Sequence, residues 1–194
     1  QQRNRIFSNG EVKWLSIPVI KKDYKNKKIL DIKVDLSQNF YVKHLKTILQ
    51  SYSKAENFDE QKNIIENFYE KKFYNLADMN ISIIKIICEH LKIPANFLRA
   101  SDIIYDGIRS DLLLKICKKL NCNEYISPEG SSIYLEKDLK IFSENNIKVN
   151  YFKYKTIEYE TFYKTFIPNL SIVDLMLNCG QKSKKIILEG ILNN

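Results

Sequence analysis

The segment from Pro168 to Gly180 carries sequence signals for both ends of a helix. Pro168 ends an extended stretch, Ser171 can accept a hydrogen bond from the first turn, and Gly180 supplies a left-handed stop. Asp174 stands three residues after Ser171, so its carboxylate can reach back to the Ser171 amide in a capping box. One face of this helix is apolar, and we expect it to dock on a core: Ile172, Leu175 and Met176.

The beginning of the chain predicts β-structure. Arg3–Phe7 and Val12–Val19 flank Asn9 and Gly10, and an Asn-Gly pair between two such runs is a strong hairpin signal. Ile29–Val34 alternates apolar and polar residues, which predicts a third strand.

Helical periodicity follows. Apolar residues recur at helical spacing in three segments: Val42–Tyr52, Asp59–Phe73 and Asp78–Leu91. Asn75 or Asp78 can cap the third helix. The sequence therefore predicts a helical insertion at about residues 42–92.

The second half alternates between strand and helix patterns. The strand candidates are Asn96–Ala100, Glu124–Ser127 and Val149–Tyr154. Ser110 can cap a helix that runs to Leu120, and Tyr134–Phe142 predicts another. Such alternation indicates βαβ units with parallel strands. We therefore predict a single α/β domain over residues 1–194, with a mixed or mostly parallel sheet, flanking helices, an N-terminal hairpin and the helical insertion.

Composition predicts a soluble, globular protein. Apolar residues make up 44% of the chain, without a run long enough to span a membrane and without a visible signal peptide. Cys117 and Cys122 have C-x4-C spacing without a second pair, so we predict no metal site. Cys88 and Cys117 fall on apolar helix stripes, and free thiols of this kind suit a reducing cytoplasm. We therefore expect a cytoplasmic location.

The net charge of +8 comes almost entirely from lysine, because only four of the 31 basic residues are arginine. The lysines are dispersed, whereas nucleic-acid-binding proteins concentrate basic residues on one surface and favour arginine for phosphate. The one dense run, Lys21 to Lys28, includes Asp23 and Asn26 and predicts a solvated hairpin loop. We therefore expect no nucleic-acid partner.

Two segments carry candidate anion ligands. The turn around Ser127 and Gly130 follows a predicted strand and precedes a helix, where phosphate can bind, although Pro, Gly and Ser also form ordinary connections there. Arg3 and Arg5 should share one face of a strand, with Asn4 opposite. The two guanidinium groups can bind a pyrophosphate or a carboxylate, or can form surface salt bridges.

Each of the remaining candidates also has a structural interpretation. Arg99 and Arg109 bracket an acidic loop, where each can bind a ligand or pair with an aspartate. His44 and His90 lie on separate predicted helices, and a structural role is the simpler reading of both. The sequence contains no recognisable nucleophile–base motif, no phosphate-loop motif and no cofactor signature.

Five blocks in the chain, taken in order, resemble the WbqC-like protein family of bacterial surface-polysaccharide (O-antigen) biosynthesis. The blocks are Arg3-Asn4-Arg5-Ile6 with Asn9-Gly10 and Trp14-Leu-Ser-Ile-Pro-Val19; His44-Leu-Lys-Thr-Ile48 through Tyr52; Asn75-Leu-Ala-Asp78 with Asn80-Ile-Ser-Ile-Ile84; Tyr125-Ile-Ser127 with Gly130 and Tyr134-Leu135; and Phe166 through Gly180. The match to the family pattern extends over nearly the whole chain.

The chain differs from the family pattern in two places. It starts with Gln1, and the strand and Q-P-x-x-x-P-x-x-G-Y-F motif with which family members open are not seen, so we expect the chain to begin inside the family pattern. The loop from Pro128 to Ser131 has less glycine than relatives tend to carry.

The resemblance implies a transferase that moves an acyl or aminoacyl group to the amine of a nucleotide-linked amino sugar. In this reading the arginines and the Gly130 loop bind phosphate, and His44 or Asp174 is the base. Asn169 and the amides beside Ser171 would meet an anion at the helix N-terminus, although Ser171 can also be a plain cap. The alternative is a non-catalytic protein that binds a sugar nucleotide or serves as a scaffold. The sequence identifies neither the sugar nor the oligomeric state.

Overall fold

A hairpin opens the fold, as the sequence predicts. In the computed structural model, which describes residues 2–22, 27–104 and 106–192, strand β1 (Arg3–Ser8) pairs antiparallel with β2 (Glu11–Ser16). Asn9 and Gly10 take positive φ angles of 53° and 83°, the backbone that a tight hairpin turn requires.

The two faces of the hairpin have different surroundings. Ile6 and Ser8 are buried, whereas Arg3 and Arg5 both lie over the ring of Trp14 on the opposite face. The alternation that places both arginines on one side is therefore confirmed.

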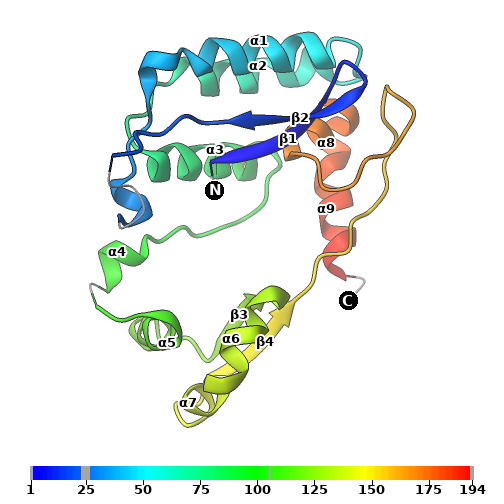
Figure 1. The fold of residues 1–194 in the computed structure, drawn as a ribbon. Coiled ribbons are helices and arrows are strands. Elements are labelled where there is room, and N and C mark those ends of the chain that lie inside the picture. The colour runs from blue at the N-terminus through cyan, green and yellow to red at the C-terminus, as the bar shows by residue number, and fades with distance from the viewer. Residues whose placement is uncertain (1, 23–26, 105, 193–194) are drawn as a thin grey trace. The chain divides into compact units, whose positions relative to one another are not determined.

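Three helices follow the hairpin and match the predicted helical segment. They are α1 (Phe40–Tyr52), α2 (Phe58–Glu70) and α3 (Leu76–His90). Asn75 begins α3, because its side chain accepts hydrogen bonds from the amides of Ala77 and Asp78. Figure 1 shows the hairpin running beside these helices. Two groups of buried side chains fill the space between them, one around Phe40 and Met79 and one around Ile48 and Tyr52.

The predicted strand Ile29–Val34 is wrong. Its first part is a 3-10 turn, η2 (Ile29–Asp31), and a second such turn, η3 (Leu36–Gln38), precedes α1. Between the turns the chain is extended, but Val34 and Lys33 form only isolated bridges with Val19 and Asn75. Alternation produced an extended segment here without a partner strand long enough to form a ladder.

The C-terminal helix has the predicted ends. Helix α8 (Ile172–Cys179) is followed by η6 (Gly180–Lys182) and α9 (Ser183–Leu192). Ser171 accepts a hydrogen bond from the Val173 amide, and Gly180 has a φ of 53°. The capping box is wrong, because the Ser171 amide donates to the Arg5 carbonyl at 2.8 Å and the Asp174 carboxylate accepts hydrogen bonds from tyrosine hydroxyls.

The chain between Ala95 and Lys155 contains one βαβ unit. Strand β3 (Glu124–Pro128) pairs in parallel with β4 (Lys148–Phe152). The helical elements of this part are α4 (Ala100–Ile103), α5 (Arg109–Lys119), η4 (Glu129–Ser131), α6 (Ser132–Leu135), η5 (Glu136–Asp138) and α7 (Leu139–Ser143). Its core contains Cys117, Leu135, Phe142 and Ile147.

Three expectations for this part are corrected. Residues 96–99 form no strand and lead into α4. Ser110 does not cap α5, because the cap position is Ile108 and Ser110 is buried inside the first turn. The helix expected over Tyr134–Phe142 is divided into α6, η5 and α7. A local apolar pattern does not specify these boundaries.

The fold is of the predicted α/β class, with an antiparallel hairpin and a parallel strand pair flanked by helices. The contacts form two compact units, one from the chain up to Pro94 with Thr156–Gly190, and one built on Ala95–Lys155. The single-domain organisation stays a prediction.

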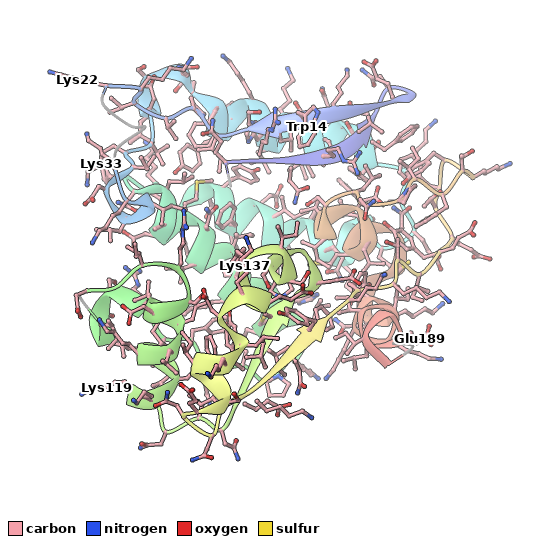
Figure 2. The ribbon with its side chains drawn as sticks, turned by 60° about the horizontal axis from the view of Figure 1, so that its bottom comes forward. Trp14, Lys22, Lys33, Lys119, Lys137 and Glu189 are labelled. Atoms are coloured by element: carbon pink, nitrogen blue, oxygen red, sulfur yellow. The ribbon has the colours of Figure 1, made fainter. Side chains whose placement is uncertain are left out.

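The predicted basic hairpin loop lies largely in residues 23–26, outside the described residues. Figure 2 shows labelled lysines on separate segments. No helix in the described part of the chain combines the length and the apolar character needed to cross a membrane.

Candidate functional site

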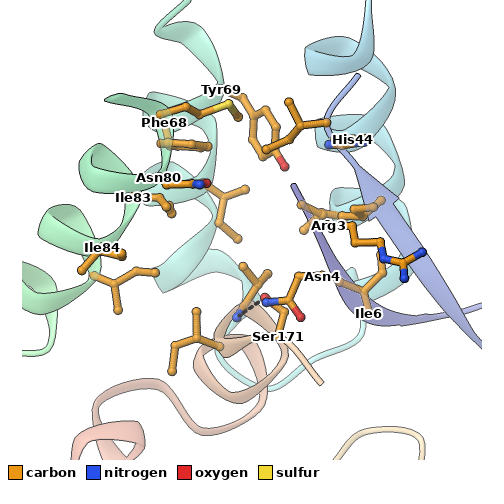
Figure 3. Close-up of a pocket in the computed structure, with 18 of the residues that line it drawn as sticks. Arg3, Asn4, Ile6, His44, Phe68, Tyr69, Asn80, Ile83, Ile84 and Ser171 are labelled. Atoms are coloured by element: carbon orange, nitrogen blue, oxygen red, sulfur yellow. Dashed lines mark hydrogen bonds between the residues drawn. The ribbon is translucent and has the colours of Figure 1, made fainter. Parts of the chain in front are cut away.

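A cavity of about 470 Å³ lies within the first unit, between the hairpin and the helices (Figure 3). Its walls are mainly aliphatic and aromatic. The apolar lining residues are Ile6, Leu15, Ile17, Ile48, Ile64, Ile65, Phe68, Tyr69, Met79, Ile83, Ile84, Ile87, Ile172, Val173 and Met176. This volume and this lining are typical of a site for a small organic ligand.

The isoleucines of α3 explain why the cavity is apolar. Ile83, Ile84 and Ile87 follow one another on the helix at spacings that keep them on adjoining faces. Ile83 packs against the core around Met79, whereas Ile84 is 49% exposed. The apolar surface of α3 is therefore wider than the core covers, and the uncovered part forms a wall of the cavity.

His44 is the one histidine among the residues that line the cavity. It is 9% exposed, and its ring meets the rings of Phe40 and Tyr69 at centroid distances of 5.3 and 6.1 Å. Burial lowers the pKa of His44, and a hydrogen bond with the Ser16 backbone only partly opposes this effect. His44 is therefore neutral at pH 7, and a neutral imidazole has one nitrogen that can accept a proton.

Polar groups gather where β1 meets the start of α8. Asn4 and Ser171 line the cavity and lie next to each other in Figure 3. The hydrogen bond from the Ser171 amide to the Arg5 carbonyl fixes this junction. Arg3 also contributes to the lining, and its guanidinium extends away from α3 in Figure 3. Asn80 is a further polar residue of the lining, on α3. The structure therefore brings together four of the predicted residues: Arg3, Asn4, His44 and Ser171.

Arg5 and Asn169 are brought together in a different way. The Arg5 guanidinium donates to the Asn169 carbonyl through Nε at 3.2 Å and through Nη2 at 2.8 Å, and Nη2 also donates to the Pro168 carbonyl at 3.1 Å. Asn169 has a φ of 61°, and its side-chain oxygen accepts a hydrogen bond from Thr156 at 3.5 Å. These contacts give Arg5 a structural task, which is to hold the chain that leads into α8.

Asp174, the other candidate base, is enclosed by tyrosines. Its side chain is fully buried and accepts hydrogen bonds from Tyr52 at 2.7 Å, from Tyr159 at 2.7 Å and from Tyr163 at 3.0 Å. Tyr52 lies on α1, and the other two belong to the irregular segment before α8. The cluster ties three parts of the first unit together around one carboxylate.

The Asp174 cluster changes the acidity of its neighbours. Burial raises the pKa of Asp174, and the three tyrosine hydrogen bonds partly offset that increase. Burial, with the Asp174 charge, raises the pKa of all three tyrosines. Burial also raises the pKa of the Cys179 thiol to about 11, with a smaller contribution from Asp174. At neutral pH Cys179 is therefore a thiol and a poor nucleophile.

The other four predicted residues lie in the second unit. Ser127 is buried, and its hydroxyl hydrogen-bonds with that of Ser131, which donates to the Pro128 carbonyl at 2.6 Å. These hydrogen bonds pair the two serine hydroxyls with partners inside the turn itself. A Cβ at Gly130 would meet nothing within 4 Å. Arg99 precedes α4, and Arg109 opens α5 with a φ of 51°.

Several residues of interest were not singled out from the sequence. Tyr159 and Tyr163 meet Asp174 from a segment without regular structure, which carries no periodic signal. Tyr69 and Asn80 line the cavity, but each falls on a helix whose pattern indicates only amphipathic packing. Trp14 belongs to the first family block, and as the one tryptophan of the chain it could have been chosen as a candidate site residue.

The chemistry available to the cavity is acid–base chemistry and hydrogen bonding. Among the described residues, no group of three His, Cys, Asp or Glu side chains is placed so that it could hold a metal ion. The cavity can enclose an apolar group, His44 can accept a proton, and Asn4 and Ser171 can orient a polar group beside it.

The fold and the cavity define a small α/β protein with a ligand-sized apolar site beside its N-terminal hairpin. The chain belongs to the WbqC-like protein family, whose model matches residues 1–186. It is also similar to a Mycobacterium tuberculosis (strain ATCC 25618 / H37Rv) protein with the name "Uncharacterized protein Rv1507c", with 26% identity over 185 residues that cover 94% of this chain and 79% of the relative. No solved structure matches the chain.

Proposed function

We propose that this protein transfers an acyl or aminoacyl group to the amine of a nucleotide-linked amino sugar during surface-polysaccharide assembly, and that the cavity holds the transferred group. Membership of the WbqC-like family supports the pathway. The apolar walls support the nature of the group, because they would favour an alkyl chain over a sugar or a phosphate. The four cysteines are free, and we propose a cytoplasmic location on that basis.

The observation that carries the proposal is a buried histidine on the wall of an apolar cavity, where burial lowers its pKa. A sugar ammonium must lose a proton before its nitrogen can attack. In the proposed step His44 takes that proton, the nitrogen forms a bond to the acyl carbon, and the bond from that carbon to its leaving group breaks with the electron pair going to the leaving group, which departs with the second proton of the nitrogen. Asn4 and Ser171 would hydrogen-bond to the polar end of the substrate.

The test is a transfer assay with acyl thioesters and acyl adenylates as donors and nucleotide-linked amino sugars as acceptors, read by mass spectrometry. We expect N-acylated product from the wild-type protein and at least about 100-fold less from His44→Gln, since a general base contributes on that order. His90→Gln is the matched control, because His90 is not among the residues that line the cavity. Absence of product from every pair would overturn the proposal.

The alternative is a non-catalytic protein that binds a sugar nucleotide in the same pathway. The enclosure of Asp174 favours it, because one of the two candidate bases is buried behind three tyrosines. Isothermal titration separates the two functions. Binding of the nucleotide-linked amino sugar to wild type and His44→Gln alike, without product from either, would indicate the binding protein.

A further inference from the structure

Trp14 lies on the face of the hairpin opposite Ile6, and 53% of its surface is exposed. Indole is the largest apolar side chain, and half-exposed tryptophans on a strand are often involved in recognition. Trp14 stands directly opposite Arg5 in the β1–β2 register. The Arg3 guanidinium carbon is 4.4 Å from the centroid of the Trp14 ring, and that of Arg5 is 5.8 Å away.

The two arginines differ in what their guanidinium groups contact. Arg5 donates to the carbonyls of Pro168 and Asn169. Arg3 has the contact with Trp14, and within the described part of the chain its side chain makes no hydrogen bond or ion pair. Arg3 therefore presents its N–H donors outward, held in place by the indole. Neither arginine has a carboxylate partner among the described residues, so the surface is positively charged.

This combination suits one kind of ligand. A planar aromatic ring can stack on the open surface of an indole, and a phosphate can accept two parallel hydrogen bonds from a guanidinium. A nucleoside diphosphate carries both groups a short distance apart. Arg3 also contributes to the cavity lining, but its guanidinium lies with Trp14 on the hairpin face opposite Ile6, so the diphosphate would bind on that face.

We propose that Trp14 and Arg3 form the binding surface for the nucleoside diphosphate part of the substrate, with the base stacked on Trp14 and the diphosphate on Arg3. The inference rests on the proposed function, since it names the part of the sugar nucleotide that this surface holds. Arg5 is a positioning residue here, because it supports Trp14 from the adjacent strand and anchors the chain before α8.

Trp14 provides the measurement, because it is the one tryptophan in the chain and its fluorescence reports on this surface alone. Uridine, cytidine, guanosine and thymidine diphosphates are titrated separately into the wild-type protein, with inorganic pyrophosphate and the free nucleosides as comparisons. We expect saturable quenching by at least one nucleoside diphosphate. The affinity for pyrophosphate alone or for a nucleoside alone should be lower than that by a factor of about ten or more.

Variants test each contact. Arg3→Gln should lower the affinity for the nucleoside diphosphate about tenfold or more, since charge-assisted hydrogen bonds to phosphate are lost. Trp14→Leu should lower this affinity by a similar factor, measured by isothermal titration calorimetry. Lys13→Gln, the neighbour of Trp14 on β2, is the control and should leave the affinity within about twofold. Thermal unfolding of each variant verifies that the hairpin is intact.

Absence of saturable quenching by all four nucleoside diphosphates would overturn the inference, as would equal affinities for wild type and Arg3→Gln. The outcome is separable from that of the proposed function. If a nucleoside diphosphate binds but no acyl transfer occurs, the inferred binding surface stands and the proposed enzyme activity is overturned. If acyl transfer to a sugar nucleotide occurs but binding of that sugar nucleotide leaves Trp14 fluorescence unchanged, the proposed enzyme activity stands and the inference is overturned.

Discussion

The Tyr52 hydroxyl donates a 2.7 Å hydrogen bond to the buried carboxylate of Asp174 and accepts a 3.0 Å hydrogen bond from the Phe7 amide. One side chain of α1 thereby joins the first strand of the hairpin to the C-terminal helix α8. Tyr52 is completely buried, so water cannot replace either bond if the hydroxyl is removed. This relationship is the basis of the first two predictions.

Tyr52→Phe should lower the free energy of unfolding by about 1–3 kcal/mol, because the Phe7 amide and Asp174 each lose a buried partner while the ring is retained. Urea unfolding followed by circular dichroism measures the change. Tyr74→Phe is the control, since Tyr74 is 70% exposed, and its effect should stay within about 0.5 kcal/mol. Equal effects of the two substitutions would show that the Tyr52 hydroxyl contributes nothing specific.

Asp174 should make the protein less stable as pH rises. Burial raises its pKa in the folded state above the ordinary value of 3.8, so the folded protein binds more protons than the unfolded chain between those two pKa values. In that interval the Asp174 contribution to the free energy of unfolding falls with increasing pH, and it is constant above the folded pKa.

The measurement is the difference in the free energy of unfolding between wild type and Asp174→Asn across pH 3 to 8. Asparagine does not titrate, so the difference isolates Asp174 from the other carboxylates. The advantage of wild type over the variant should decrease as pH rises from about 4. An advantage that increases with pH would mean that the tyrosine hydrogen bonds outweigh burial and lower the pKa of Asp174.

Gly180→Ala should destabilise the protein by about 2–3 kcal/mol. Gly180 has φ 53° and ψ −130°, a combination that residues with a Cβ rarely adopt. A Cβ there would also collide with the Asn57 side chain, which donates a 2.8 Å hydrogen bond to the Asn178 carbonyl. Gly130→Ala is the matched control, because a Cβ there meets open space, and it should change stability by less than about 0.5 kcal/mol. Thermal and urea unfolding of both variants give the comparison.

Substitutions at Asn169 should separate a backbone role from a ligand role. Asn169 has a φ of 61°, so Asn169→Ala should cost about 1 kcal/mol in stability, whereas Asn169→Gly should cost less. If the side chain also binds substrate, both variants should lose affinity for the sugar nucleotide to the same degree. If Asn169→Gly keeps its affinity for the sugar nucleotide, Asn169 has only the backbone role, in the turn that Arg5 anchors.

The elements that could be predicted from the sequence are those whose energies come from residues close together in the chain. The Asn9-Gly10 turn, the Asn75 and Ser171 caps and the Gly180 stop all depend on backbone angles or hydrogen bonds within a few residues. The same locality explains the prediction of α1, α2 and α3, because their apolar periodicity is read over one or two turns.

The candidate site could be predicted only in part. The alternation of β1 placed Arg3 and Arg5 on one face, and the structure adds that both lie over Trp14. His44 was a candidate from its place in a family block, but its neutral state follows from burial among rings of α1 and α2. The cavity itself has no local signal, because its lining comes from six different elements: β1, β2, α1, α2, α3 and α8.

The sequence by itself determined where the hairpin turns and where α8 begins, limited the start of α3 to Asn75 or Asp78, and indicated that β3 and β4 run parallel around a helical connection. Only the tertiary structure decided that Asp174 turns away from its cap to meet Tyr52, 122 residues earlier in the chain, and that Ile29–Val34 lacks a partner strand. The physical reason is the range of the interactions. Caps and turns are stabilised by neighbouring residues, whereas a buried carboxylate is directed by whichever donors the folded chain brings to it.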